Sequence, residues 1–137
     1  MLLPSDFLGP WHVEWAIDDR LSGAAGRFDC RATFAEAGDA LRCREEGTLR
    51  LGDGPALTAS RENLWRWDAE DVEVLFADGR PFHRFVPSGE GPGTDHPCGP
   101  DLYRVRYDFT SWPLWRAKWH VEGPHKSYAL RSLYARA

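Results

Sequence analysis

The chain lacks several features on which whole classes of proteins depend: it has few cysteines, no long apolar run and no cluster of basic residues. Its three cysteines, Cys30, Cys43 and Cys98, are an odd number without CxxC spacing, so we expect free thiols. No apolar run approaches the ~18 residues of a membrane span, and residues 1–6 lack the basic start of a signal peptide. We therefore expect a cytoplasmic protein without a membrane partner.

Charge and composition narrow the class further. The net charge is −4 and the basic residues are scattered singly, so nucleic acid is not an expected partner. An apolar content of 42% with seven Trp and seven Phe excludes a disordered chain. At 137 residues the chain is expected to form one domain, residues 1–137, with a core of its own.

From Trp11 onward, apolar and polar residues alternate, and Gly, Pro and Asp interrupt the alternation at short intervals. This pattern predicts an all-β, up-and-down antiparallel barrel of about nine strands. Only residues 4–9 suggest a helical turn, with Ser5 as its cap. The Gly- and Pro-rich residues 87–100 are the one long loop and a candidate lid. The expected strands are residues 11–17, 28–34, 40–51, 56–67, 71–77, 80–86, 101–109, 114–122 and 125–135.

Hairpin lengths predict which residues face each other. A two-residue type I′ turn at Asp78-Gly79 would place Val74 opposite His83. A loop at residues 52–56 would place Glu45 opposite Asn63 and diagonal to Arg61.

The C-terminal hairpins are predicted in the same way. A loop around Gly123-Pro124 would pair Trp119 with Tyr128 and Val121 with Lys126. The turn at residues 110–113 would pair Tyr103 with Val121 and Tyr107 with Ala117. One β-bulge would reverse the facing of the side chains beyond it.

These registers place polar side chains on the apolar face of the strands. Burying an unpaired charge costs several kcal/mol or more, so an interior that holds such groups is expected to be a lined cavity. The inward polar residues are Glu45, Arg61, Asn63, His83, Asp101, Tyr103, Lys126 and Tyr128.

Each of these groups also has a purely structural interpretation. Glu45 and Arg61 form either an ion pair that braces the barrel or a pair that faces a ligand. His83 is either a hydrogen-bonded core residue or an acid, base or ligand contact. Lys126 could neutralise Asp101 or an anionic ligand. The seven tryptophans are expected to fill the core, and an aromatic clamp for a flat ligand is the alternative.

The densest polar segment, residues 96–103, opens a strand after the long loop. Asp101 and Tyr103 are expected to point inward at the barrel mouth, with His96 and Cys98 above it. The spacing of these side chains matches no familiar zinc arrangement, so we predict no metal site and no cofactor. A Cys98 nucleophile paired with a histidine has no local signature to support it.

Short motifs carry a resemblance to the calycins, the superfamily of lipocalin-like barrels. Gly9-Pro10-Trp11 resembles the Gly-x-Trp motif of the first lipocalin strand, and Arg131 or Arg136 on the last strand would then cover Trp11, as a basic residue does in lipocalins.

A more extensive resemblance covers nearly the whole chain and identifies it as a member of domain-of-unknown-function family 6314, whose proteins are lipocalin-sized. No activity comes with this family. The resemblance implies a barrel whose signature motifs coincide with the inward polar residues. These motifs are Asp19-Arg20-Leu21-Ser22-Gly23, Gly26-Arg27-Phe28, Arg44-Glu45-Glu46-Gly47, Asp78-Gly79-Arg80-Pro81-Phe82-His83, His96-Pro97-Cys98, Asp101-Leu102-Tyr103 and Gly123-Pro124-His125-Lys126-Ser127-Tyr128.

The first functional hypothesis is a carrier or sensor that binds a small, partly polar ligand inside the barrel, anionic ligands included. The predicted ligand-binding residues are Glu45, Arg61, Asn63, His83, His96, Cys98, Asp101, Tyr103, Lys126 and Tyr128. The second is a small β-barrel isomerase, lyase or hydrolase with His83 or Asp101 as general base and Tyr103 as acid. The third is haem binding through His83, His96 or His125.

Overall fold

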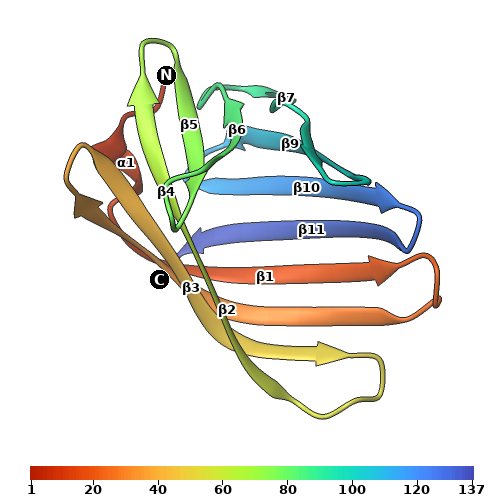
Figure 1. The fold of residues 1–137 in the computed structure, drawn as a ribbon. Coiled ribbons are helices and arrows are strands. Elements are labelled where there is room, and N and C mark those ends of the chain that lie inside the picture. Colours follow the sequence, from red (N-terminus) through yellow and green to blue (C-terminus); the bar gives the residue numbers. More distant parts are fainter.

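The computed structural model describes residues 1–137, in which eleven strands form one antiparallel sheet that curls into a nearly closed barrel (Figure 1). Along the sheet the strands follow the order β6-β5-β4-β3-β2-β1-β11-β10-β9-β7, and β8 pairs with β9. No helix in the structure has the length and apolarity that crossing a membrane requires. The elements are α1 (Pro4–Phe7), β1 (Gly9–Asp19), β2 (Ala25–Ala37), β3 (Ala40–Leu51), β4 (Leu57–Asp68), β5 (Asp71–Phe76), β6 (Pro81–Phe85), β7 (Glu90–Pro92), β8 (His96–Cys98), β9 (Asp101–Ser111), β10 (Leu114–Gly123) and β11 (Lys126–Arg136).

The predicted all-β, up-and-down barrel is confirmed, and the count of nine strands is corrected to eleven. The two additional strands, β7 and β8, lie within residues 87–100, which we expected to form one long loop. Both are three residues long and pair with β9. Strands this short in a Gly- and Pro-rich segment leave no alternation to detect, so the sequence pattern does not reveal them.

Two predicted registers are wrong by two residues. Glu45 lies directly opposite Arg61, not opposite Asn63, because β3 and β4 pair through Leu49 and Leu57. In the same way Val121 lies opposite Tyr128. An even shift leaves every side chain on its predicted face, since side chains alternate with a period of two.

Three other predicted pairs are confirmed. Tyr103 lies opposite Val121 and Tyr107 opposite Ala117. Val74 lies opposite His83, although the hairpin between β5 and β6 contains a bulge beyond Val74.

The Asp78-Gly79 turn itself differs from the predicted type I′ turn. Gly79 has a φ of 90°, whereas Ala69 is the sole non-glycine residue with a positive φ. Asp78 therefore does not adopt the left-handed conformation that a type I′ turn requires at both central positions. The bulge compensates for the shift in register that the different turn introduces. Val74 and His83, which lie beyond the bulge, therefore still pair.

Helix α1 closes one end of the barrel with a single side chain. Phe7 is fully buried and lies within an aromatic cluster. The rings with centroids between 5.0 and 6.5 Å from that of Phe7 belong to Trp11, Phe34, Trp65, Trp67, Phe109, Trp112 and Trp115. The predicted cap at Ser5 is wrong, because the helix begins at Pro4 and the Asp6 carboxylate accepts a hydrogen bond from the Leu3 amide.

Arg136 covers Trp11, as the lipocalin resemblance implies. Its guanidinium carbon lies 3.9 Å from the centre of the indole ring, and Nη1 donates a hydrogen bond to the Leu8 carbonyl. Arg131, the other candidate, is exposed on the outer face of β11. Trp11 in turn donates from Nε1 to the Phe7 carbonyl, so Arg136 and Trp11 together hold α1 in place.

We predict that Phe7→Ala lowers the free energy of unfolding by about 3 to 5 kcal/mol, since a fully buried ring at the centre of an aromatic cluster leaves a large cavity when removed. Leu3→Ala is the control, because Leu3 lies one turn away and is 54% exposed. Its unfolding free energy should stay within about 0.5 kcal/mol of the wild type in urea titrations. Similar small losses in both variants would contradict the plugging role of Phe7.

Candidate ligand-binding site

A cavity of about 480 Å³ lies inside the barrel, toward the end opposite α1. Its volume is within the range of small-molecule sites, about 300 to 1,000 Å³. Ten of its fourteen lining residues are hydrophobic, and Leu51 at its edge is 52% exposed, so the cavity communicates with solvent. The lining residues are Trp15, Ile17, Leu51, Arg61, Glu62, Asn63, Phe76, Phe82, Tyr103, Trp119, Val121, Lys126, Tyr128 and Leu130.

Glu45 forms the polar centre of the barrel. Its side chain is 2% exposed, and Oε1 accepts hydrogen bonds from Trp15 Nε1 at 2.8 Å and from the Tyr134 hydroxyl at 3.1 Å. The Cys30 thiol lies 3.7 Å from the same oxygen. Oε2 pairs with Nε of Arg61 at 3.0 Å. These donors offset the desolvation of a carboxylate that would otherwise be too costly to bury.

Arg61 connects this polar centre to the cavity. Its ion pair with Glu45 uses Nε, which leaves the two Nη atoms for another partner, and its side chain is 40% exposed. The guanidinium carbon lies 5.4 Å from the ring centre of Trp15. Burial lowers the pKa of Arg61, but the Glu45 carboxylate and other nearby groups together raise it by more, so the net pKa lies above its ordinary value. The group therefore remains a cation.

A second, inner compartment of about 20 Å³ lies next to the main cavity. The two share Trp15, Arg61, Asn63 and Trp119 as lining residues. The rest of the inner lining consists of Cys43, Glu45, Trp65, Val74, His83, Tyr107, Trp115, Ala117 and Tyr134.

His83 lies in the inner compartment and does not line the main cavity. It is 5% exposed, and its Nε2 is 2.8 Å from the Tyr107 hydroxyl. Burial, followed by the positive charges of Arg61 and His96, lowers the pKa of His83 to about 3. The imidazole is therefore neutral near pH 7, which makes it a weak general base.

An ion pair defines the mouth of the cavity. Lys126 Nζ lies 3.3 Å from Asp101 Oδ2, and the hydrogen bond to Asp101 together with the nearby Tyr103 raises the pKa of Lys126. The Asp101 carboxylate packs so closely over Gly123 that an added Cβ would lie 1.8 Å from Oδ1. Glycine at this position therefore allows the ion pair to join β9 and β11 over the end of β10.

The remaining predicted residues differ in their relation to the cavity. His96 lies at its rim, with its ring centre 5.5 Å from that of Phe76 and 5.1 Å from that of Phe82. Cys98 is exposed, does not line the cavity and has no part in this arrangement. His125, one of the haem-ligand candidates, lies in the turn between β10 and β11. No group of three or more His, Cys, Asp or Glu side chains is positioned to hold a metal ion.

Sequence reasoning did not assign several side chains that complete the site. Trp15 and Trp119 were expected mainly as core residues, with an aromatic clamp as the alternative, Tyr107 was paired with Ala117 but given no role in the site, and Tyr134 was not considered. Tyr134 shares its face of β11 with Tyr128, so side-chain alternation along that strand could have identified it.

The two buried thiols are poor nucleophiles. Burial, followed by the charge of Glu45, raises the pKa of Cys30 to about 12, and burial raises that of Cys43 well above its ordinary value. Nucleophilic attack requires the thiolate, which neither cysteine forms near neutral pH.

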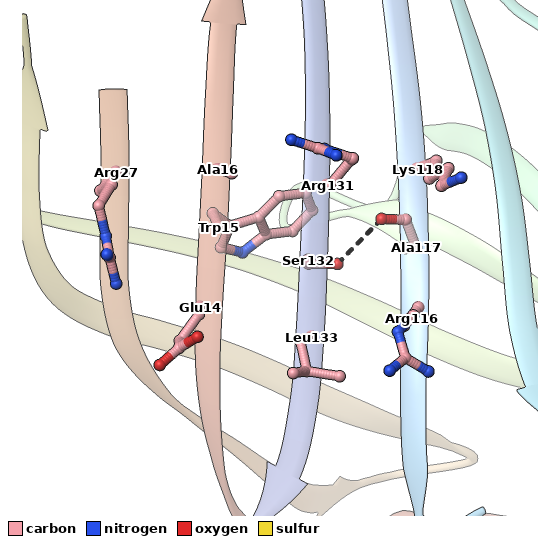
Figure 2. Close-up of a pocket in the computed structure, with 10 residues that line it drawn as sticks. All are labelled: Glu14, Trp15, Ala16, Arg27, Arg116, Ala117, Lys118, Arg131, Ser132 and Leu133. Carbon is pink, nitrogen blue, oxygen red and sulfur yellow. Dashed lines mark hydrogen bonds between the residues drawn. The ribbon is translucent and has the colours of Figure 1, made fainter. Parts of the chain in front are cut away.

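A hollow of about 470 Å³ lies on the outer face of the barrel, over β1, β11 and β10 (Figure 2). Arg116, Lys118 and Arg131 project from it toward solvent, whereas Trp15 points behind the sheet into the barrel. Five of its ten lining residues are charged and four are hydrophobic, whereas ten of the fourteen residues that line the interior cavity are hydrophobic. The interior cavity is therefore the better small-molecule site.

The comparisons with known proteins agree with this architecture. Residues 7–136 match the model described as "Family of unknown function (DUF6314)". The chain belongs to this family. The membership inferred from the motifs is thus confirmed, and the barrel fits the calycin description. No curated protein sequence matches the chain at a significant level.

Two solved structures share the fold at low sequence identity. An S-type phycobiliprotein lyase from Guillardia theta is 9% identical over 98% of this chain and 90% of its own length, with a TM-score of 0.67. A protein of unknown function from the DUF3598 family of Nostoc punctiforme is 10% identical over 98% of this chain and 48% of its own length, with a TM-score of 0.62. At such identities the likeness establishes the fold alone.

We predict that Glu45→Gln lowers the free energy of unfolding by about 3 kcal/mol, because it removes the buried charge that pairs with Arg61. Glu46→Gln is the matched control: Glu46 is the next residue on β3, its side chain is 59% exposed, and it pairs with Arg44 on the surface. Its loss should be under about 1 kcal/mol. Chemical denaturation measures both, and equal small effects would show that Glu45 is not charged and paired in solution.

We also predict that burial of His83 causes the free energy of unfolding to decrease at acidic pH. Its pKa is 6.5 in the unfolded chain and about 3 when folded. Between these values the unfolded state binds more protons. The free energy of unfolding therefore falls as pH is lowered through this interval, by up to about 1.4 kcal/mol per pH unit.

The measurement is urea unfolding at a series of pH values from about 6 to about 4 for three proteins. His83→Gln should show a shallower decline in stability than the wild type. His120→Gln, which alters an exposed histidine on the outer face of β10, should follow the wild type. A wild-type slope in His83→Gln would mean that other groups cause the acid sensitivity.

Proposed function

We propose that the protein binds a small, largely apolar molecule with one polar end inside the barrel, as a carrier or sensor. The observation that supports this proposal is the interior cavity itself, which is mostly apolar yet bounded by Arg61 at its inner end and Lys126 at its mouth. Apolar walls provide affinity through surface burial, and a few fixed polar groups provide orientation.

The predicted ligand-binding residues contribute to this proposal in different ways. Arg61, Asn63, Tyr103, Lys126 and Tyr128 line the cavity directly. Glu45 acts through Arg61, Asp101 acts through Lys126, and His96 packs against the aromatic wall, so these three are positioning residues.

The enzyme alternative has weaker support from the geometry. His83 has a pKa of about 3 and lies beneath the main cavity, and Asp101 is engaged by Lys126. Neither the Asp101 carboxylate nor the His83 imidazole is therefore available as a general base next to Tyr103. One protein of the same fold is a phycobiliprotein lyase, so a barrel of this kind is compatible with enzymatic activity. Binding of a ligand without its conversion is nevertheless the function that the described side chains fit best.

The test uses N-phenyl-1-naphthylamine, an uncharged fluorescent probe of apolar cavities. We expect it to bind the wild type with a rise in fluorescence. Leu130→Trp should weaken binding at least about tenfold, because Leu130 lines the cavity and the larger ring would fill it. Arg131→Trp introduces the same ring one residue later on the outer face and should bind the probe like the wild type. Binding that is unaffected in Leu130→Trp, or absent from the folded wild type, would refute the proposal.

A further inference from the structure

The inner compartment has room for a single water molecule or hydroxyl group. At about 20 Å³ it exceeds the roughly 10–15 Å³ that a single water requires and is far too small for an apolar chain. It adjoins the main cavity through Trp15, Arg61, Asn63 and Trp119, which line both spaces. A molecule in the main cavity could therefore extend one small group into it.

Two buried polar atoms have no partner in the protein, Nδ1 of His83 and Nε1 of Trp115, and both residues line this compartment. The two residues are 5% and 1% exposed. A buried polar atom without a hydrogen bond costs about 1–3 kcal/mol. Three other residues of the lining are bonded to one another, since Trp15 and Tyr134 both donate hydrogen bonds to Glu45. The two unpartnered atoms therefore indicate a missing occupant.

The charges of the site argue against an anionic occupant. Arg61 is balanced by Glu45, and Lys126 is balanced by Asp101. Neither cation is left without a counterion, so an added anion would face a neutral pair and not a free positive charge. An unbalanced ion in such an interior is far more costly than an uncharged polar group.

From these observations we propose that the inner compartment receives a single uncharged oxygen, a hydroxyl or a carbonyl, at the end of an otherwise apolar ligand. The oxygen accepts a hydrogen bond from Trp115 Nε1 and occupies the position that faces His83 Nδ1. The apolar remainder lies in the main cavity and points toward Lys126. This inference rests on the proposed function and adds the ligand class and its orientation.

A hydroxyl is the group that fits both tautomers of His83. When the Tyr107 hydroxyl donates to Nε2, Nδ1 carries the proton and donates to the ligand oxygen. When Nε2 carries the proton, Nδ1 accepts from the ligand hydroxyl. Trp115 Nε1 is a donor in either case. A hydroxyl satisfies both arrangements, whereas a carbonyl satisfies only the first.

The experiment compares 1-decanol with decanoate, two ligands with the same chain length and different heads, by displacement of N-phenyl-1-naphthylamine at about pH 7.5. We expect 1-decanol to bind at least about tenfold more tightly to the wild type. Trp115→Phe removes the unpartnered donor and keeps an aromatic ring stacked on Tyr134. It should weaken 1-decanol about fivefold and leave the affinity for N-phenyl-1-naphthylamine unchanged.

Each outcome decides the matter. Decanoate binding as tightly as 1-decanol would show that Arg61 recruits an anion and would overturn the inference. Equal effects of Trp115→Phe on both neutral ligands would show that the oxygen does not enter the inner compartment. The first comparison needs only the wild type, so it stands even when the variant fails to fold. Failure of N-phenyl-1-naphthylamine to bind at all would instead refute the proposed function, and this inference with it.

Discussion

The buried carboxylate of Glu45 is the constraint on which the rest of the interior depends. Because an isolated buried ion is so costly, the strands around it must supply donors, and they do so from β1, β4 and β11 at once. Trp15, Arg61 and Tyr134 are thereby fixed in orientation. Arg61, held at one nitrogen, presents the others toward the cavity. Glu45, which does not contact a ligand in our proposal, thus determines the orientation of Arg61, which does.

The barrel is divided along its axis into three zones with different chemistry. Around α1 the interior is an aromatic core centred on Phe7. The middle is a polar network around Glu45 and His83, and the far end is an apolar cavity with a charged mouth. The aromatic zone provides the stability that allows the other two to remain imperfectly packed. A site that contains unpartnered polar atoms requires such support, because these atoms lower the stability of the folded state.

Alternation along the strands was sufficient to predict the fold and the inward direction of Glu45, Arg61 and His83. It did not predict the register at two hairpins, because the sequence does not show at which residue strand pairing ends and the turn begins. The direct opposition of Glu45 and Arg61 was therefore missed, although their proximity was expected. The role of Phe7 was missed as well, since a four-residue helix has no periodicity to show which face it buries. The cavity arises from the combined volumes of side chains on many strands, and no local pattern encodes it.

The seam of the barrel is joined by irregular chain instead of by paired strands. The amide of Thr94 donates to the Arg84 carbonyl, and Gly93 donates to Val105, so residues 93–94 bridge β6 and β9. An added Cβ at Gly93 would lie 2.7 Å from Val105 Cγ1 and 2.9 Å from the Arg84 oxygen. Without this bridge, the outer edge of β6 would expose unpaired backbone groups, which attract the strand edges of other molecules. The absence of a side chain at Gly93 thus lets the chain cross this gap, because a larger residue would collide with Val105 and the Arg84 carbonyl and hold β6 and β9 apart.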